Sequence, residues 1–256
     1  MAIKMIVTDL DRTLLRTDKS ISDYTVSVFK KCREKGILTA IATARSETAA
    51  KRYIEWINPD IVVSNGGALV RLDNKIIYRS VLSADISDKL TCELLHNSNV
   101  GYITVETDSG YYVTYSEPAN HPDYNHGIYN DFKIPLREDT YKIMVEIFDD
   151  NTANYYANKY KECNIIKFSG ESWYRFANKN ANKVIALRQI IEKLNISFSE
   201  AAAFGDDFND IEMLKECGIG VAVDNAIAEA KAAANYICDS NDNDGVARWI
   251  ERNILR

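Results

Sequence analysis

The sequence predicts an α/β protein that has a parallel-sheet core and an inserted α+β domain. Short apolar strands alternate with amphipathic helices near the N-terminus, the alternation breaks in the middle of the chain, and it resumes toward the C-terminus. Such alternation is typical of a parallel sheet covered by helices, as in Rossmann-like folds. The simplest arrangement joins residues 1–82 and 181–256 into one core and inserts residues 83–180 as a second domain.

The N-terminal region begins with Ile3–Thr8, which is apolar and rich in β-branched residues, as expected for a buried strand. Ser22–Lys35 places Val26, Phe29 and Cys32 on one face and offers Ser22 as an N-cap, so it predicts a helix. Further expected elements are the strands Ile37–Ala42 and Ile61–Ser64 and the helix Ser46–Trp56.

The middle of the chain has a different pattern, in which apolar and polar residues alternate and tyrosine is frequent. This period of two predicts half-buried antiparallel strands. We expect strands at Tyr102–Glu106, Tyr111–Tyr115, Lys142–Phe148, Ile165–Ser169 and Trp173–Phe176, and helices at Asp85–Leu95 and Thr152–Glu162.

The last part of the chain returns to alternating helices and strands. We expect helices at Lys183–Leu194, Asp207–Glu216, Ala226–Ala233 and Gly245–Ile254, and strands at Ala201–Phe204, Ile219–Val223 and Tyr236–Cys238.

Composition and charge exclude several classes of protein. Hydrophobic residues make up 46% of the chain, enough to bury a core. The net charge of −6 gives no long-range attraction to nucleic acid or to an anionic membrane, so neither is expected as a partner. The five cysteines form no C-x-x-C pair, and no apolar stretch is long enough for a membrane span or a signal peptide. We therefore expect a cytoplasmic protein with free thiols.

The strongest motif is Asp9-Leu-Asp11-Arg-Thr13, at the carboxyl end of the first predicted strand. Ligands of open α/β sheets bind at this edge. Residues i and i+2 of an extended chain point the same way, so two carboxylates are expected to crowd one site and to share a cation. Mg²⁺ suits such oxygen ligands. The alternative for this motif is a solvated turn.

A second acidic motif, Gly205-Asp-Asp-Phe-Asn-Asp210, follows the strand predicted at Ala201–Phe204. Its three carboxylates, of Asp206, Asp207 and Asp210, predict a second set of metal-binding groups. An ordinary helix N-cap would account for Asp207 alone.

Two weaker signals concern anion binding. Thr43-Ala44-Arg45 follows a strand and precedes a helix, where a hydroxyl and backbone N–H groups can hold an anion. Lys183 begins a predicted helix. Taken alone, the first is also typical of an ordinary cap and the second of a solvated surface lysine.

These motifs together resemble the haloacid dehalogenase superfamily, and within it the Cof-like branch of capped phosphatases. The resemblance covers most of the chain, and the inserted region occupies the place of that branch's cap. The matching segments, in order, are DLDRTLL from Asp9, TAR from Thr43, SNGG from Ser64, NK at Lys183, GDDFNDIEML from Gly205, VAVDNA from Val221 and DGV from Asp244.

The resemblance implies a phosphatase that depends on Mg²⁺ and acts on small phosphate monoesters such as sugar phosphates. Asp9 would attack phosphorus and form an aspartyl-phosphate, and Asp11 would act as general acid and base. The metal would be bound by Asp9, by Asp11 through its backbone carbonyl, and by Asp206, with Asp210 orienting its surroundings.

The resemblance also implies four residues that would bind the phosphate group: Thr43, Ala44, Lys183 and Asn209. The chain departs from the family at Arg12, where glycine is usual, and at Val184, which often is glycine. The sequence leaves open whether Arg12 projects toward solvent or toward the substrate.

The inserted domain offers weak candidates for substrate contacts. Pro118–Phe132, with His121 and His126, is interpreted as a polar surface loop. Trp173 and Arg175 are expected on one face of a strand, where they could meet a sugar phosphate or simply pack within the sheet.

Two other functions remain open beside hydrolysis. A phosphomutase would pass the phosphoryl group to a sugar, and a non-enzymatic protein would only bind a phosphorylated metabolite. Asp11 favours an enzyme because turnover needs an acid and base, whereas binding does not. The natural substrate and the oligomeric state do not follow from the sequence.

Overall fold

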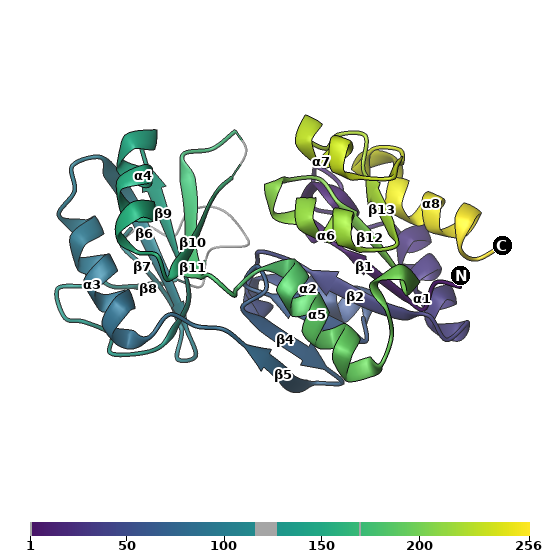
Figure 1. The fold of residues 1–256 in the computed structure, drawn as a ribbon, viewed down its shortest axis with the longest axis horizontal. Helices are drawn as coiled ribbons and strands as arrows, with labels where there is room; N and C mark the ends of the chain where they lie inside the picture. The colour runs from purple at the N-terminus through teal and green to yellow at the C-terminus, as the bar shows by residue number, and fades with distance from the viewer. Residues whose placement is uncertain (1, 116–126, 169) are drawn as a thin grey trace. The chain divides into compact units, whose positions relative to one another are not determined.

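The computed structural model describes residues 2–115, 127–168 and 170–256, which divide into two compact units. The first unit contains the chain up to Tyr78 together with Asn182–Arg256, and the second contains Arg79–Ala181 (Figure 1). Each unit has its own hydrophobic core.

The first unit is built on an eight-stranded sheet with the order β14-β13-β12-β1-β2-β3-β4-β5. The pairs from β14 to β3 are parallel, and β4 pairs with β3 in the antiparallel direction. The predicted α/β fold class is therefore confirmed. The strands are β1 (Met5–Thr8), β2 (Leu38–Ala42), β3 (Ile61–Ser64), β4 (Leu69–Leu72), β5 (Lys75–Arg79), β12 (Ala201–Gly205), β13 (Ile219–Ala222) and β14 (Tyr236–Ile237).

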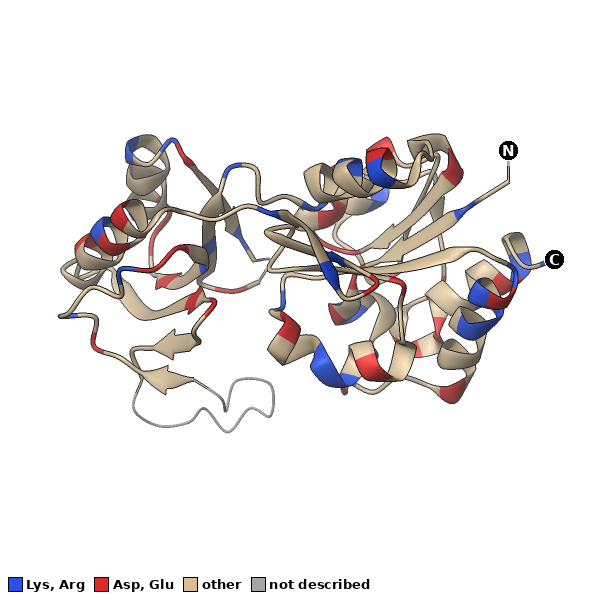
Figure 2. Cartoon of the chain, turned by 90° about the horizontal axis from the view of Figure 1, so that it is seen from below, with Lys and Arg blue, Asp and Glu red and all other residues tan. Residues whose placement is uncertain are grey.

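Helices cover both faces of this sheet (Figure 2). On one side α1 packs against α2 and α8, and on the other α6 packs against α5 and α7. The hydroxyls of Ser22 and Ser46 cap α1 and α2, as predicted. The helices are α1 (Asp23–Glu34), α2 (Glu47–Ile57), α5 (Lys183–Leu194), α6 (Ile211–Glu216), α7 (Ala228–Ala233) and α8 (Gly245–Asn253).

Two details of this unit differ from expectation. The strands β4 and β5 were not predicted, because they follow β3 without a helical crossover and the alternation rule does not reach them. In α1, Phe29 and Cys32 are buried as expected, but Val26 is only half-buried and Val28 lies in the core.

The second unit has a six-stranded sheet with the order β10-β11-β9-β6-β7-β8. The pairs from β10 to β7 are antiparallel, as predicted, and β8 is parallel to β7. Leu90 and Leu94 of α3 and Tyr156 of α4 bury one face of this sheet. The elements are α3 (Ala84–Leu95), β6 (Val100–Thr107), β7 (Tyr111–Val113), β8 (Ile128–Tyr129), β9 (Thr140–Ile147), α4 (Asp150–Lys159), β10 (Cys163–Lys167) and β11 (Trp173–Asn178).

The sequence predicts a polar loop over Pro118–Phe132, whereas the structure has the short strand β8 at Ile128–Tyr129. His121 and His126 lie outside the described residues, as does Ser169 at the end of a predicted strand. Across the described ranges, no helix is long and apolar enough to cross a membrane.

Trp173 and Arg175 lie on the same face of β11, opposite Glu146 and Met144 of β9. Arg175 is fully buried, and its guanidinium donates a hydrogen bond to the carbonyl of Ala181 at 3.1 Å. Burial lowers the pKa of Arg175 to about 10. Its described hydrogen bond is thus made within its own unit, so a structural role accounts for it without a substrate contact.

Candidate active site

Asp9 lies at the carboxyl end of β1, between the parallel strands β2 and β12. Its N–H donates to the carbonyl of Phe204 at 3.0 Å, so the ladder between β1 and β12 continues into the first residue of the loop. The side chain is nearly buried. The end of the strand thus fixes the nucleophile candidate at the edge where open α/β sheets bind ligands.

Asp206 follows β12 directly, next to Asp9, and Asp210 folds back toward it. Oδ2 of Asp210 accepts hydrogen bonds from the N–H groups of Asp206 at 3.0 Å and of Asp207 at 3.2 Å. The turn requires a glycine at 205, because a Cβ there would lie 2.4 Å from Cβ of Asp210. Asp207 also caps the following turn by accepting from the N–H of Phe208, as the alternative interpretation of this residue foresaw.

Lys183 lies at the first position of α5 and joins the two acidic loops. Its Nζ lies 2.6 Å from Oδ1 of Asp9 and 2.7 Å from Oδ1 of Asp210. The preceding residue, Asn182, caps the helix by accepting from the N–H of Val184. Lys183 is 2% exposed, so the interpretation as a solvated surface lysine is wrong.

The loop after β3 holds the start of α5 in place. Gly67 has φ of +101°, and a Cβ added to it would lie 2.3 Å from the backbone carbon of Asn182. Only glycine fits both this backbone conformation and this close approach. The SNGG segment therefore helps to position Lys183.

Burial is the largest influence on the pKa values of Asp9, Asp206 and Lys183 at this site. Burial raises the pKa of Asp9 well above its usual value, against the lowering effect of Lys183, and Asp210 and Asp206 raise it further. Burial and the charge of Asp210 raise the pKa of Asp206 to about 7. Burial alone would lower the pKa of Lys183, but Asp210 and Asp9 raise it. One ammonium thus faces three carboxylates, and the group favours taking up a further cation or a proton.

The residues fit a hard divalent cation. Asp9, Asp206 and Asp210 each offer a carboxylate oxygen, and these atoms lie within 4.8 Å of one another. Thr13 donates to Oδ1 of Asp206 at 2.7 Å and orients that carboxylate. Both oxygens of Asp210 already accept hydrogen bonds, whereas Oδ2 of Asp9 and Oδ2 of Asp206 accept none from the described residues. Asp9 and Asp206 are therefore the better ligands, and Asp210 is suited to orienting the group.

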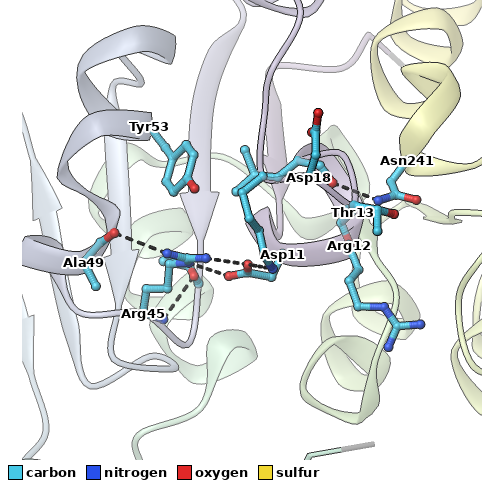
Figure 3. A network of polar contacts seen from close by, with 12 residues as sticks. Asp11, Arg12, Thr13, Asp18, Arg45, Ala49, Tyr53 and Asn241 are labelled. Atoms are coloured by element: carbon cyan, nitrogen blue, oxygen red, sulfur yellow. Dashed lines mark hydrogen bonds and ion pairs between the residues drawn. The ribbon is translucent and has the colours of Figure 1, made fainter. Parts of the chain in front are cut away.

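Asp11 differs from the expectation that it would crowd one site with Asp9. Its carboxylate accepts from Nε of Arg45 at 2.6 Å and from Nη2 of Arg45 at 2.7 Å (Figure 3). It also pairs with Nζ of Lys19 at 2.7 Å. Burial would raise the pKa of Asp11, but the hydrogen bonds and charge of Arg45, with Lys19, lower it to about 2. The chain leaves the extended conformation after Asp9, and two cations bind the Asp11 carboxylate, which is not part of the cluster of Asp9, Asp206 and Asp210. Its charge still raises the pKa of Asp9.

The remaining predicted residues surround this region. Thr43 is buried at the end of β2, where its hydroxyl accepts from the N–H of Arg45 at 3.1 Å and keeps its own proton for another acceptor. Ala44 follows it in the same loop. Asn209 is half-buried in the turn before α6, and no described hydrogen bond joins its side chain to the acidic group.

Arg12 adopts φ of 59° and ψ of 3°, a left-handed conformation that favours glycine. This explains why glycine is the usual residue of the family here. The carbonyl of Arg12 accepts from Nδ2 of Asn225 at 2.7 Å, and Oδ1 of Asn225 accepts from the N–H of Asn241. The loop therefore keeps this geometry with a side chain in place.

The sequence did not predict the residues that bind or position the predicted site residues. Arg45 and Lys19 bind Asp11, Thr13 binds Asp206, and Asn182 caps α5. Thr13 belongs to the DLDRTLL motif and Arg45 to the TAR motif, and Asn182 directly precedes Lys183, so their positions were a usable signal. Nothing in the local pattern around Lys19 indicated a contact with Asp11.

Residues 6–250 match the family model of the haloacid dehalogenase-like hydrolases. The chain is 29% identical over 260 residues to the 5-amino-6-(5-phospho-D-ribitylamino)uracil phosphatase YcsE of Bacillus subtilis, covering 99% of this chain and 96% of that protein. It is 26% identical over 260 residues to YitU, a phosphatase of the same name from that organism, with 96% of each chain covered.

Solved structures share the fold. The HAD subclass IIB sugar phosphatase BT4131 superposes with a TM-score of 0.86 at 21% identity, covering 97% of this chain and 98% of that one. A haloacid dehalogenase-like hydrolase from Bacteroides thetaiotaomicron gives 0.83 at 24% identity, covering 98% and 99%. The chain therefore belongs to the haloacid dehalogenase-like hydrolases, and it is a phosphatase of that family.

Proposed function

We propose that this protein hydrolyses small phosphate monoesters with the help of Mg²⁺, through an aspartyl-phosphate on Asp9. The observation that carries the proposal is the placement of Asp9. One of its oxygens is bound by Lys183 at 2.6 Å, and the other accepts no hydrogen bond from the described residues. Lys183 thus orients the carboxylate, one of whose two oxygens would face the cation while the other attacks phosphorus.

The surrounding residues would stabilise the transferring group. Lys183 would offset the charge of the phosphoryl oxygens, and the hydroxyl of Thr43 and the backbone at Ala44 would hold them, with Asn209 as a further contact. Phosphoryl transfer relies mostly on such positioning and charge stabilisation. Lys183 contacts Asp9 and Asp210 together, so it would also keep the nucleophile oriented between turnovers.

Asp9 and Asp206 would bind Mg²⁺ through side-chain oxygens and Asp11 through its backbone carbonyl, with Asp210 fixing the turn around them. The cation would neutralise charge on the phosphate and on the crowded carboxylates. Thr13 keeps Asp206 oriented whether or not the cation is bound.

Asp11 would protonate the leaving oxygen and later accept a proton from the attacking water. In the described conformation, Arg45 and Lys19 keep its carboxylate ionised, with a pKa of about 2. A carboxylate with so low a pKa is a weak base and has no proton to donate. Both proton steps therefore require Asp11 to exchange its contacts with Arg45 and Lys19 first.

The substrate would be a small phosphorylated metabolite. The relatives YcsE and YitU make 5-amino-6-(5-phospho-D-ribitylamino)uracil the first compound to test, with sugar phosphates beside it. Residues 83–180 would act as a cap that contributes to the choice among them. The five free cysteines support a cytoplasmic location.

The test measures release of inorganic phosphate from these compounds and from p-nitrophenyl phosphate, with Mg²⁺ and with EDTA. Asp9→Asn should abolish release, and EDTA should abolish it in the wild type. Asp23→Asn, which neutralises an exposed carboxylate in the first turn of α1, should leave it unchanged. Release that persists without Asp9 or without metal would contradict the proposal, and phosphate recovered on a second sugar would indicate a mutase.

A further inference from the structure

Two motifs of the sequence, the VAVDNA and DGV segments, have no part in the proposed chemistry. In the structure both contact the loop that follows β1 and carries Asp11. Nδ2 of Asn225 donates to the carbonyl of Arg12 at 2.7 Å, and Oδ2 of Asp244 lies 2.9 Å from Nη2 of Arg16. These contacts join residues that are 213 and 228 positions apart. The loop is therefore held by parts of the chain far from it in sequence.

Asn241 connects the VAVDNA segment to the far end of the same loop. Its N–H donates to Oδ1 of Asn225 at 2.9 Å, and its Nδ2 donates to the carbonyl of Leu15 at 2.9 Å (Figure 3). Asn241 is 3% exposed, so water cannot readily replace these partners. The carbonyls of Arg12 and Leu15 are thus bound by two residues that are hydrogen-bonded to each other. Any movement of the loop would leave buried polar groups unpaired, which is costly.

The turn between these carbonyls contains an unfavourable backbone conformation. Arg12 has φ of 59° and ψ of 3°, which a residue with a Cβ rarely adopts. Asp11 precedes it, and the hydroxyl of the following Thr13 is bound to Asp206. Relaxation at Arg12 would shift the backbone of Asp11 on one side and of Thr13 on the other. The hydrogen bond from Asn225 to the Arg12 carbonyl opposes that relaxation.

We propose that Asn225, supported by Asn241, is a positioning residue for the proton transfers of Asp11. It acts through the carbonyl of Arg12 and fixes the backbone of Asp11 while the side chain turns from its ion pairs to the leaving oxygen. Proton transfer requires the two heavy atoms to lie about 3 Å apart, so a small shift of this loop slows it. This inference rests on the proposed function, which assigns the proton transfers to Asp11.

The experiment compares leaving groups that differ in their need for a proton. A sugar alkoxide leaves readily only when it is protonated, whereas p-nitrophenolate leaves without a proton, so the general acid matters much more for the first. We would measure kcat/KM at saturating Mg²⁺ for ribose 5-phosphate, fructose 6-phosphate and p-nitrophenyl phosphate. This constant reports the loss of transition-state stabilisation relative to free enzyme and substrate.

For Asn225→Ala we expect kcat/KM to fall roughly tenfold with the sugar phosphates and less than about threefold with p-nitrophenyl phosphate. A purely structural role would lower the amount of folded enzyme, and all three values would then fall by the same factor. The ratio between the two kinds of substrate therefore separates positioning from stability.

Asn225→Asp tests the donor by itself. It keeps the size of the side chain and the acceptor for Asn241, but it removes the donor to the Arg12 carbonyl, so it should show the same selective loss. Asn253→Ala is the matched control, because it removes an exposed amide that donates to the carbonyl of Trp249 on α8. It should change none of the three values. An equal loss for all three compounds, or wild-type values in both Asn225 variants, would overturn the inference.

Failure of this inference is distinguishable from failure of the proposed function. Phosphate release that requires Asp9 and metal, but falls equally for every compound in the Asn225 variants, would leave the hydrolase and reject the role of Asn225. Release that persists in Asp9→Asn would reject the proposed function itself, and that result comes from a different variant.

Discussion

The ammonium nitrogen of Lys183 lies 2.6 Å from Oδ1 of Asp9, and the two residues are separated by 174 positions in the chain. The same nitrogen lies 2.7 Å from Oδ1 of Asp210. A single buried cation therefore joins the loop after β1 to the loop after β12. This bridge makes the acidic group tolerable before any metal binds.

Replacing this lysine should affect both activity and stability. We expect Lys183→Met to lower turnover at least about 100-fold, because charge stabilisation of the phosphoryl group is lost. In EDTA it should also destabilise the fold by about 3 kcal/mol, because buried carboxylates lose their partner. Mg²⁺ should then raise the melting temperature more than in the wild type. Thermal unfolding with EDTA and with Mg²⁺ measures this.

Lys193→Met on the exposed face of the same helix is the matched control. It should change neither quantity appreciably. If both variants melted like the wild type in EDTA, the bridge would contribute nothing to stability.

The pKa of about 7 for Asp206 predicts a pH dependence of the metal-free protein. Between about pH 4 and 7 the folded state keeps a proton on Asp206 that the unfolded state has released. The free energy of unfolding should therefore fall as the pH rises through this range and level off above it. Urea unfolding in EDTA at several pH values measures the slope, and Asp206→Asn should reduce it. Parallel curves for the two proteins would refute the assignment.

For Asp11 we expect the opposite pH dependence, in which the free energy of unfolding rises with pH. Arg45 and Lys19 lower its pKa to about 2, so it stabilises the fold above the usual aspartate pKa and loses this effect as the pH falls from about 4 toward 2. The gap in unfolding free energy between wild type and Asp11→Asn should be widest near neutral pH and close in acid. A gap that does not change with pH would show that the two ion pairs add no stability. Asp23→Asn serves as the control.

Gly67→Ala should be among the most damaging single substitutions in the first unit. A Cβ there meets the backbone of Asn182 at 2.3 Å, in a conformation with φ of +101°. We expect a loss of about 3 kcal/mol in unfolding free energy, together with a loss of activity as Lys183 is displaced. Chemical denaturation and phosphate release measure the two effects.

Gly36→Ala separates the conformational strain from the collision. Gly36 has φ of +74°, but a Cβ added to it meets nothing within 4 Å. It should cost only about 1 kcal/mol and leave activity intact. Equal losses for the two variants would mean that the contact with Asn182 has no effect of its own.

Regular elements of the fold were largely predictable from local pattern. Ile61–Ser64 and Lys183–Leu194 have the bounds that the sequence predicted, and the hydroxyls of Ser22 and Ser46 cap their helices as expected. Apolar periodicity and capping act within a few residues, so they can be recognised in a single chain. The sequence does not predict β4, β5 and β8, because none of them belongs to the alternation of strands and helices and each depends on pairing with a neighbouring strand.

The contacts of the candidate site followed from the sequence less completely. The motifs identified the acidic residues and Lys183, and the structure brings Asp9, Asp206, Asp210 and Lys183 together. The hydrogen bonds of Asp11 were not predicted, since extended geometry suggested a carboxylate beside Asp9. Arg45 and Lys19, which hold it, come from different parts of the chain.

The sequence by itself determined most of the elements, the α/β class and the chemical groups available for phosphate and metal chemistry. The tertiary structure decided which groups meet. It placed β12 beside β1, set the first residue of α5 against both strand ends, and left Arg12 without a carboxylate partner among the described residues. The physical reason is range: propensity, capping and periodicity act between near neighbours in the chain. A bridge between Lys183 and Asp9 exists only after distant strands have paired and the core beneath them has packed.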